Sequence, residues 1–180
     1  MSKARLATRT EDELQAATLD ALAPVRMNGK LSDVYLQFAN SEPAIQAYLA
    51  MEQSLKAGAL NDVELECIKL LVSQQTQCDF CLAVHSMKAG LLGIEVARQL
   101  QIRRGEPTGD ARLDAILTMV RGFFQKPGPV SEVQLQAVRD AGVTDQQMVD
   151  ITMAVSTIFF TNITNHINDT PVTLKPAPPL

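Results

Sequence analysis

Two of the three cysteines and one of the two histidines lie within eight residues, in the segment CDFCLAVH. Cys78 and Cys81 are three positions apart, and on a helix such residues are neighbours whose Cα atoms lie within the range that a disulfide tolerates. The pair can therefore interconvert between a dithiol and a disulfide. His85 follows Cys81 by one helical turn, where an imidazole can accept a thiol proton or stabilise a thiolate.

The surrounding residues predict where this helix begins. The stretch from Asp79 to Ala89 favours a helix, and Gly90 is typical of a helix end. Cys78 and Cys81 then lie at a helix N-terminus, where free N–H groups and a partial positive charge lower a cysteine pKa from about 8.5 toward neutral. One of the two thiols is therefore a candidate nucleophile.

The preceding predicted helix offers a carboxylate that could orient the imidazole. Asn61-x-x-Glu64 has the spacing of a capping box and leads into VELECIKLLVSQQ, where an apolar stripe surrounds Glu66. An unpaired acid among apolar neighbours is costly, so Glu66 is a candidate partner for His85 in a proton relay.

Glu66, Cys78, Cys81 and His85 together form the pattern E-x11-C-x2-C-x3-H. This pattern resembles the active-site signature of the AhpD-like alkylhydroperoxidases in the carboxymuconolactone decarboxylase superfamily. The segments NSEPAIQAYLAM, LNDVELECIKLLVSQQTQC and FTNITNHINDTPV are similar to this superfamily as well, so the resemblance covers roughly residues 30 to 172.

The resemblance implies an all-helical homo-oligomer, a trimer or a hexamer, that reduces hydroperoxides without a cofactor or a metal. The polar N-terminus separately favours a soluble, cytoplasmic protein. Cys81 would attack the peroxide and become a sulfenic acid, and Cys78 would resolve it to a disulfide. Glu66 and His85 would relay protons, and an external dithiol would restore the pair. The pattern departs from the best-known peroxidases of the family at Phe80, where they carry a second histidine.

Other interpretations of the cysteine pair remain open. The CxxC motif could also be half of a zinc site or a pair of inert thiols, although structural zinc needs four ligands. The same superfamily contains lactone decarboxylases, and a non-catalytic redox sensor would use the same dithiol. Cys67 is interpreted as a small buried hydrophobe, and His166 as a polar helix-end or interface residue.

The rest of the chain predicts an all-α fold of seven or eight helices, with an extension at 1–30, a helical domain at 31–172 and a Pro-rich tail at 173–180. The last helix is apolar around most of its circumference, which favours burial on several sides, either centrally or at a subunit interface. The other predicted helices cover 10–22, 43–57, 61–75, 79–89, 94–102, 111–124 and 131–142.

The composition argues against two classes of partner. The net charge is -4, and Arg103-Arg104 is too small a basic cluster to follow a phosphate backbone, so nucleic acid is not expected. The N-terminus lacks an apolar signal region, and no stretch reaches the roughly 18 apolar residues of a membrane span. The expected partners are a hydroperoxide, a dithiol reductant and further copies of the chain.

Overall fold

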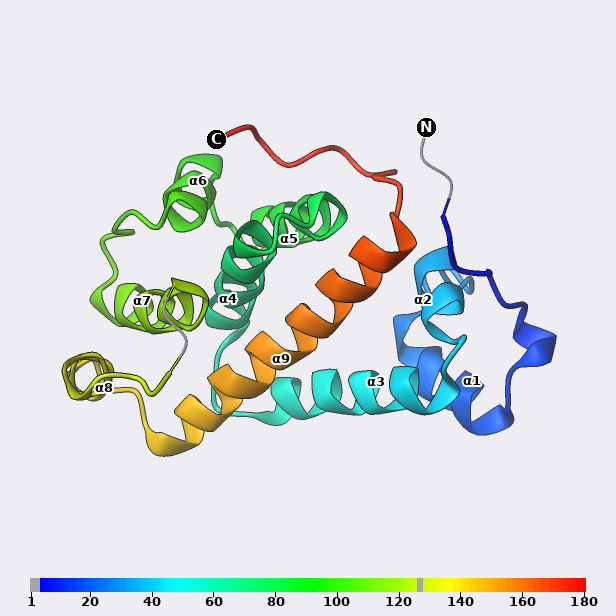
Figure 1. Cartoon of the computed structure of the whole chain (residues 1–180), viewed down its shortest axis with the longest axis horizontal. Helices are drawn as coiled ribbons and strands as arrows, with labels where there is room; N and C mark the ends of the chain where they lie inside the picture. Colours follow the sequence, from blue (N-terminus) through cyan, green and yellow to red (C-terminus); the bar gives the residue numbers. More distant parts are fainter. Residues whose placement is uncertain (1–3, 126–127) are drawn as a thin grey trace.

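A computed structural model describes residues 4–125 and 128–180, and the regular structure within them is helical (Figure 1). The all-α prediction is therefore confirmed. Two 3-10 turns, Glu11–Glu13 and Ala23–Val25, accompany nine α-helices in this part of the chain. The helices are α1 Ala16–Leu22, α2 Asp33–Phe38, α3 Glu42–Ala57, α4 Asp62–Gln75, α5 Asp79–Leu91, α6 Val96–Arg104, α7 Ala111–Gln125, α8 Glu132–Asp140 and α9 Asp145–Asn168.

Several helix boundaries differ from those that the sequence predicts. The helix expected over 10–22 is divided, because Leu14 and Gln15 have extended backbone between the first 3-10 turn and α1. The short α2 was not predicted and raises the number of helices from eight to nine. Helix α5 continues through Gly90, and the first left-handed residue after it is Gly93 at φ 79°. The sequence also predicts that the loop Lys126-Pro-Gly-Pro129 ends the helix at 111–124, and Lys126 and Pro127 lie outside the described residues.

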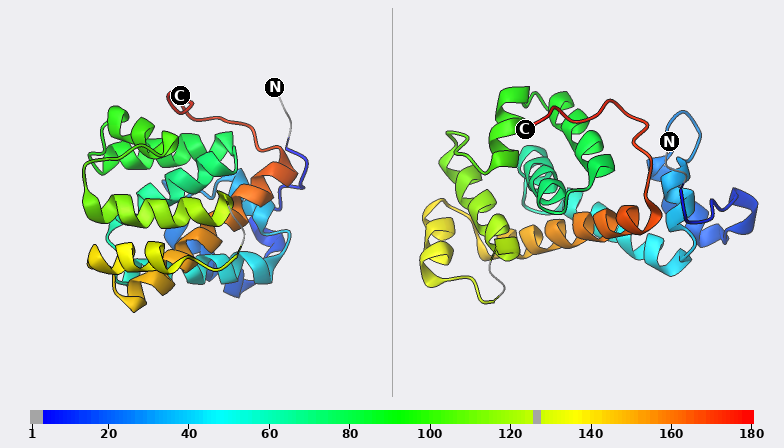
Figure 2. Two further views of the ribbon diagram at one scale, coloured as in Figure 1. Left: turned by 60° about the vertical axis from the view of Figure 1, so that its left-hand side comes forward. Right: turned by 45° about the horizontal axis from the view of Figure 1, so that its top comes forward.

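Helix α4 is the centre of the molecule (Figures 1 and 2). It packs against α5, α6, α7 and α9, and most of its side chains are buried, including the polar Glu66. The sequence predicted that the last helix would be buried either at the centre of the molecule or at a subunit interface. The central helix of the structure is α4. Helix α9 buries one face and exposes Phe159, Phe160 and Ile163 on the other. Burial on all sides explains why α4 can hold an acid away from bulk water.

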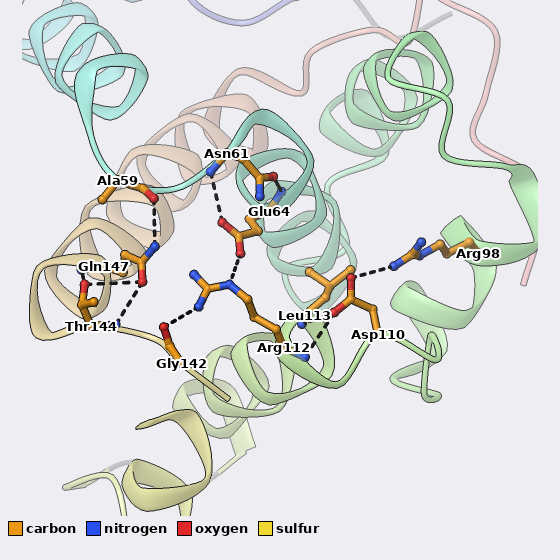
Figure 3. A network of polar contacts seen from close by, with 10 residues as sticks. All are labelled: Ala59, Asn61, Glu64, Arg98, Asp110, Arg112, Leu113, Gly142, Thr144 and Gln147. Atoms are coloured by element: carbon orange, nitrogen blue, oxygen red, sulfur yellow. Dashed lines mark hydrogen bonds and ion pairs between the residues drawn. The ribbon is translucent and has the colours of Figure 1, made fainter. Parts of the chain in front are cut away.

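Polar contacts fix the start of α4 (Figure 3). Asn61 caps the helix by accepting a hydrogen bond from the Glu64 N–H at 2.9 Å, and Glu64 in turn accepts from the Asn61 N–H. Arg112 of α7 donates to Glu64 at 2.7 Å and to the Gly142 carbonyl at 2.7 Å. The capping box predicted at Asn61 is confirmed. Arg112 joins this start of α4 to α7 and to the segment before α9.

The N-terminal residues form a second, smaller apolar cluster with α2 and α3. Its buried members include Leu22, Phe38 and Ile45. Polar contacts also connect this region to the end of α9, since the Leu6 N–H donates to Asn168 Oδ1 at 2.8 Å. The segment at Leu6 is thus hydrogen-bonded to the last helix.

The C-terminal tail has no regular structure, as predicted, and runs from the end of α9 back toward α6 (Figure 1). Arg103 of α6 donates to the Pro178 carbonyl and to Gln74 Oε1 at the end of α4. The tail is therefore held beside the connection between α4 and α5. Within the described residues, no helix has the length and apolar character needed to cross a membrane.

Candidate functional site

The cysteine pair lies where α4 passes into α5. Cys78 is the residue before the first turn of α5 and Cys81 lies within that turn, so the predicted position at a helix N-terminus is correct. The Cys78 N–H donates to the Ser73 carbonyl at 3.0 Å, which holds the new helix against the end of α4. The two sulfur atoms are 2.7 Å apart, and both residues are about 3% exposed. The thiols are close enough to share one proton.

The environment divides the acidity of the two thiols unequally. The hydrogen bond with Cys81 lowers the pKa of Cys78 below its usual value, and the backbone N–H groups of Cys81 and Phe80 act in the same direction against burial. Cys78, followed by burial, raises the pKa of Cys81 above its usual value, while Asn165 and Thr161 act to lower it. The first negative charge on the pair is therefore held mainly at Cys78.

Glu66 and His85 meet across the interface of α4 and α5. The carboxylate Oε1 and the ring Nδ1 are hydrogen-bonded, and each residue is only 7% exposed. The sequence placed these two residues together from their types alone, and the antiparallel packing of the two helices brings Glu66 opposite His85. This pair is the contact on which a proton relay would depend.

The charges of this pair follow from its burial. Burial lowers the pKa of His85, although Glu66 works to raise it, so the imidazole is neutral near pH 7. Burial works to raise the pKa of Glu66, but the hydrogen bond and charge of His85, with Lys88 and Lys69, bring it below its usual value. A neutral imidazole that donates Nδ1–H to a carboxylate keeps the lone pair of Nε2 free to act as a base.

Helix α9 holds the turn that precedes the cysteines. Asn162 donates to the hydroxyl of Thr76 at 2.7 Å, and the ring N–H of His166 donates to the Thr76 carbonyl at 2.8 Å. His166 lies at the exposed end of this helix and contacts the backbone, in agreement with its interpretation as a polar helix-end residue. These two contacts fix the backbone just before Cys78.

Sequence reasoning missed the contact of Asn165 with the pair. Its side-chain amide donates to Cys81 Sγ at 3.3 Å, and the residue is 5% exposed. Asn162, Asn165 and Asn168 recur every three residues and are all buried, which is the spacing of one helix face. Polar residues at the positions of an apolar stripe were the available signal, and the sequence analysis assigned them no site role.

Three aromatic residues of α2, α3 and α9 pack against one another. Tyr48 of α3 stacks on Phe160 of α9 with ring centroids 5.8 Å apart, and Phe38 meets Phe160 edge-on at 6.0 Å. Burial raises the pKa of Tyr48 well above 10, and negative charge at Glu52, Tyr35, Cys81 and Glu66 adds to this effect. Tyr48 is therefore a neutral phenol close to the dithiol.

A pocket of about 280 Å³ borders Glu66 on the side of α3. Its other polar lining residues include Lys69, Lys88 and Glu52, and neither cysteine contributes to it. Lys69 is bound by both carboxylate oxygens of Glu52, at 2.6 and 2.8 Å. The pocket gives Glu66 a route to solvent that does not pass the sulfur atoms.

The remaining sequence candidates lie apart from this chemistry. Cys67 is fully buried in the core around α4, and burial raises its pKa to about 12, as expected for an inert thiol. Phe80 is half-buried in the first turn of α5, between the two cysteines. Among residues 4–125 and 128–180, no three histidine, cysteine or acidic residues lie together as metal ligands would.

Comparison of the chain with known proteins gives structural relatives alone. No sequence profile of a protein family matches it, and no curated protein sequence matches it. The fold matches the alkylhydroperoxidase AhpD core of an uncharacterized peroxidase-related protein from Ralstonia eutropha JMP134, with a TM-score of 0.80 and 20% identity over 98% of this chain and 93% of that one. A putative antioxidant defence protein AhpD from Agrobacterium tumefaciens matches with a TM-score of 0.69 and 20% identity over 76% and 95% of the two chains.

A third similar structure has a different named activity. It is a debrominase in which one cysteine is replaced by alanine, in complex with 2,3,4-tribromopyrrole, and it matches with a TM-score of 0.73 and 13% identity over 94% of each chain. These identities establish a shared fold, and the debrominase indicates that the fold carries more than one activity.

Proposed function

We propose that this chain, which shares the fold of AhpD-related, peroxidase-like proteins, is a thiol-dependent peroxidase, an oxidoreductase that reduces a hydroperoxide. The observation that carries this proposal is the contact of two sulfur atoms at 2.7 Å at the start of α5, one helical turn before His85 of the buried Glu66–His85 pair. A dithiol next to a neutral base is equipped to give two electrons and two protons to a peroxide.

In the first step, Cys81 attacks as a thiolate. Because the first charge on the pair is held mainly at Cys78, the Cys81 proton passes across the sulfur contact to Cys78 as Cys81 attacks. The Cys81 sulfur bonds to the terminal peroxide oxygen, the O–O bond breaks, and the alkoxide leaves and takes up a proton. The products are a Cys81 sulfenic acid and an alcohol.

In the second step, Cys78 closes the disulfide. His85 accepts the Cys78 proton, and the Cys78 thiolate attacks the Cys81 sulfur and displaces hydroxide, which is protonated to water. The sum is one dithiol and one hydroperoxide converted to one disulfide, one alcohol and one water. An external dithiol then reduces the disulfide by thiol exchange.

The role proposed for Glu66 is to hold His85 and to exchange protons with solvent. Its carboxylate fixes the Nδ1–H tautomer and stabilises the imidazolium that forms when His85 accepts a proton. Because Glu66 also borders the pocket beside α3, the relay can be reset without water at the sulfur atoms. The buried phenol of Tyr48, which interacts with Cys81, favours a small, partly apolar hydroperoxide.

The proposed assembly is a homo-oligomer, a trimer or a hexamer. Phe159, Phe160 and Ile163 lie on one face of α9 and are 37 to 42% exposed. An exposed apolar surface of this kind is typical of subunit contacts. The oligomeric state measured by light scattering tests this part of the proposal independently of activity.

The function itself is tested by turnover. Reduced protein mixed with cumene hydroperoxide and dihydrolipoamide is expected to consume many equivalents of peroxide per chain, with one dithiol oxidised for each. A single equivalent consumed without turnover would identify a redox sensor instead. In a second assay, the reduced protein is mixed with 2,3,4-tribromopyrrole and the release of bromide is measured. Bromide release by a protein that does not consume peroxide would identify a dehalogenase and contradict the peroxidase proposal.

A further inference from the structure

A buried amide on α9 contacts the sulfur that the proposed reaction uses. Asn165 Nδ2 donates to Cys81 Sγ at 3.3 Å, a distance suited to an N–H donor and a sulfur acceptor, and the residue is 95% buried. Cys78 is served by different donors, the backbone N–H groups at the start of α5. Separate hydrogen-bond donors therefore stabilise negative charge on each of the two sulfurs.

The orientation of the Asn165 amide is set by hydrogen bonds. Thr170 Oγ1 accepts a hydrogen bond from Asn168 Nδ2 at 2.8 Å and donates its own proton to Asn165 Oδ1 at 2.7 Å. Since the carbonyl oxygen of the amide is occupied in this way, its NH₂ group must face the sulfur. A rotated amide would place an acceptor against a thiolate and would lose the bond to Thr170.

The hydrogen bonds that support Asn165 extend to Leu6 and Thr8 in the segment before α1. Asn168 is fully buried, donates to Gln37 Oε1 of α2 at 2.7 Å and accepts from the Leu6 N–H. Gln37 donates onward to the hydroxyl of Thr8 at 3.0 Å. Four side chains and the backbone of the N-terminal segment therefore hold the Asn165 amide against the Cys81 sulfur. An amide held by such a network has a fixed orientation.

We propose that Asn165 is a catalytic residue that stabilises negative charge on Cys81, and so makes Cys81 rather than Cys78 the attacking thiol. Thr170 and Asn168 are its positioning residues. The inference rests on the proposed dithiol chemistry but concerns the distribution of charge between the two sulfurs, which can be measured without a peroxide. A preorganised donor at a developing anion is an effective form of stabilisation because its orientation is already fixed.

Other groups around Cys81 do not replace this donor. The titratable groups that interact with Cys81 are Cys78 before α5 and Tyr48 on α3, and His85 follows one turn later on α5. A thiolate at Cys78 repels charge on Cys81. The hydroxyl of Thr161 also acts to lower the pKa of Cys81, less strongly than Asn165. This hydroxyl donates its proton to the Ile158 carbonyl at 2.9 Å, so the Asn165 amide is the donor directed at the sulfur.

The test is alkylation by iodoacetamide as a function of pH, followed by peptide mass spectrometry. In a Cys78→Ser background, Asn165→Leu is expected to raise the pKa of Cys81 by about one unit, a tenfold smaller thiolate fraction near neutral pH. In a Cys81→Ser background the same substitution is expected to leave the pKa of Cys78 unchanged. Thr157→Val is the control, because that buried hydroxyl bonds only to the Ala154 carbonyl of its own helix.

A second pair of variants covers the case in which Asn165→Leu does not fold. Thr170→Val removes the hydroxyl that orients the amide and is expected to raise the Cys81 pKa by a fraction of a unit. Thr170→Ser keeps a hydroxyl at this position and is expected to leave the Cys81 pKa at the parent value. An unchanged Cys81 pKa in the folded variants, or equal shifts at both cysteines, would overturn the proposal. Because iodoacetamide needs no peroxidase activity, a failure of turnover would leave this measurement valid.

Discussion

Replacement of Cys81 with serine is expected to slow the reaction of the reduced protein with cumene hydroperoxide by at least about 10³-fold, since a serine hydroxyl is not ionised at neutral pH. The remaining Cys78 keeps the backbone N–H donors of the first turn of α5, which act to lower its pKa. The variant therefore tests whether this second thiol is sufficient, or whether the sulfur that Asn165 of α9 contacts is required. Rapid mixing with peroxide and titration of residual thiols give the rate.

Cys78→Ser is the matched variant. Its Cys81 is expected to react with the first equivalent of peroxide within about tenfold of the parent rate and then to stop as a sulfenic acid, because no resolving thiol is left. Trapping by dimedone at Cys81 identifies this product. If Cys78→Ser were the variant that lost the first reaction while Cys81→Ser retained it, the proposed roles of the two cysteines would be reversed.

His85→Ala is expected to reverse the pH dependence of stability that the buried pair contributes. In the parent, the folded-state pKa of Glu66 lies below 4.5 and that of His85 below 6.5. The stabilisation from each is therefore complete above those values and is lost as the pH falls through them. Without His85, burial is the main influence left on Glu66 and raises its pKa, so the variant loses stability as the pH rises above 4.5.

The cost of this substitution should therefore grow with pH. At pH 7 an uncompensated buried carboxylate is expected to lower the free energy of unfolding by about 3 to 5 kcal/mol relative to the parent. Near pH 4.5 only the smaller loss from the deleted ring remains. Urea unfolding between pH 4.5 and 7 measures both, and the double variant His85→Ala with Glu66→Gln is expected to remove the pH-dependent part. Parallel stability curves for His85→Ala and the parent would show that Glu66 is not held ionised by His85.

The arrangement of the candidate site could be predicted from the sequence because it depends on spacing within and between two consecutive helices. Cys78, Cys81 and His85 lie on one helix, and the capping box at Asn61 fixes the helix that bears Glu66. Local rules of helix geometry therefore place these residues correctly. The short α2 was missed because six residues carry too little periodicity to distinguish a helix from a loop.

Contacts between distant parts of the chain were beyond this reasoning. Asn165 lies 84 positions from Cys81, and only the packing of α9 beside α4 and α5 brings its amide to the sulfur. The apolar pattern of α9 predicted burial on several sides, yet the chain by itself leaves Phe159 and Phe160 exposed. Periodicity indicates that a helix has an apolar face, but it does not say which neighbour covers that face.

Peptide mapping after one equivalent of peroxide tests the central claim most directly. Reduced protein treated with one equivalent of cumene hydroperoxide, then alkylated and digested, is expected to yield a disulfide between Cys78 and Cys81, with Cys67 recovered as a free thiol once the chain is unfolded. Both thiols should disappear at the rate at which cumyl alcohol forms. Peroxide loss with Cys78 and Cys81 still reduced, or a disulfide that includes Cys67, would contradict the proposed dithiol cycle.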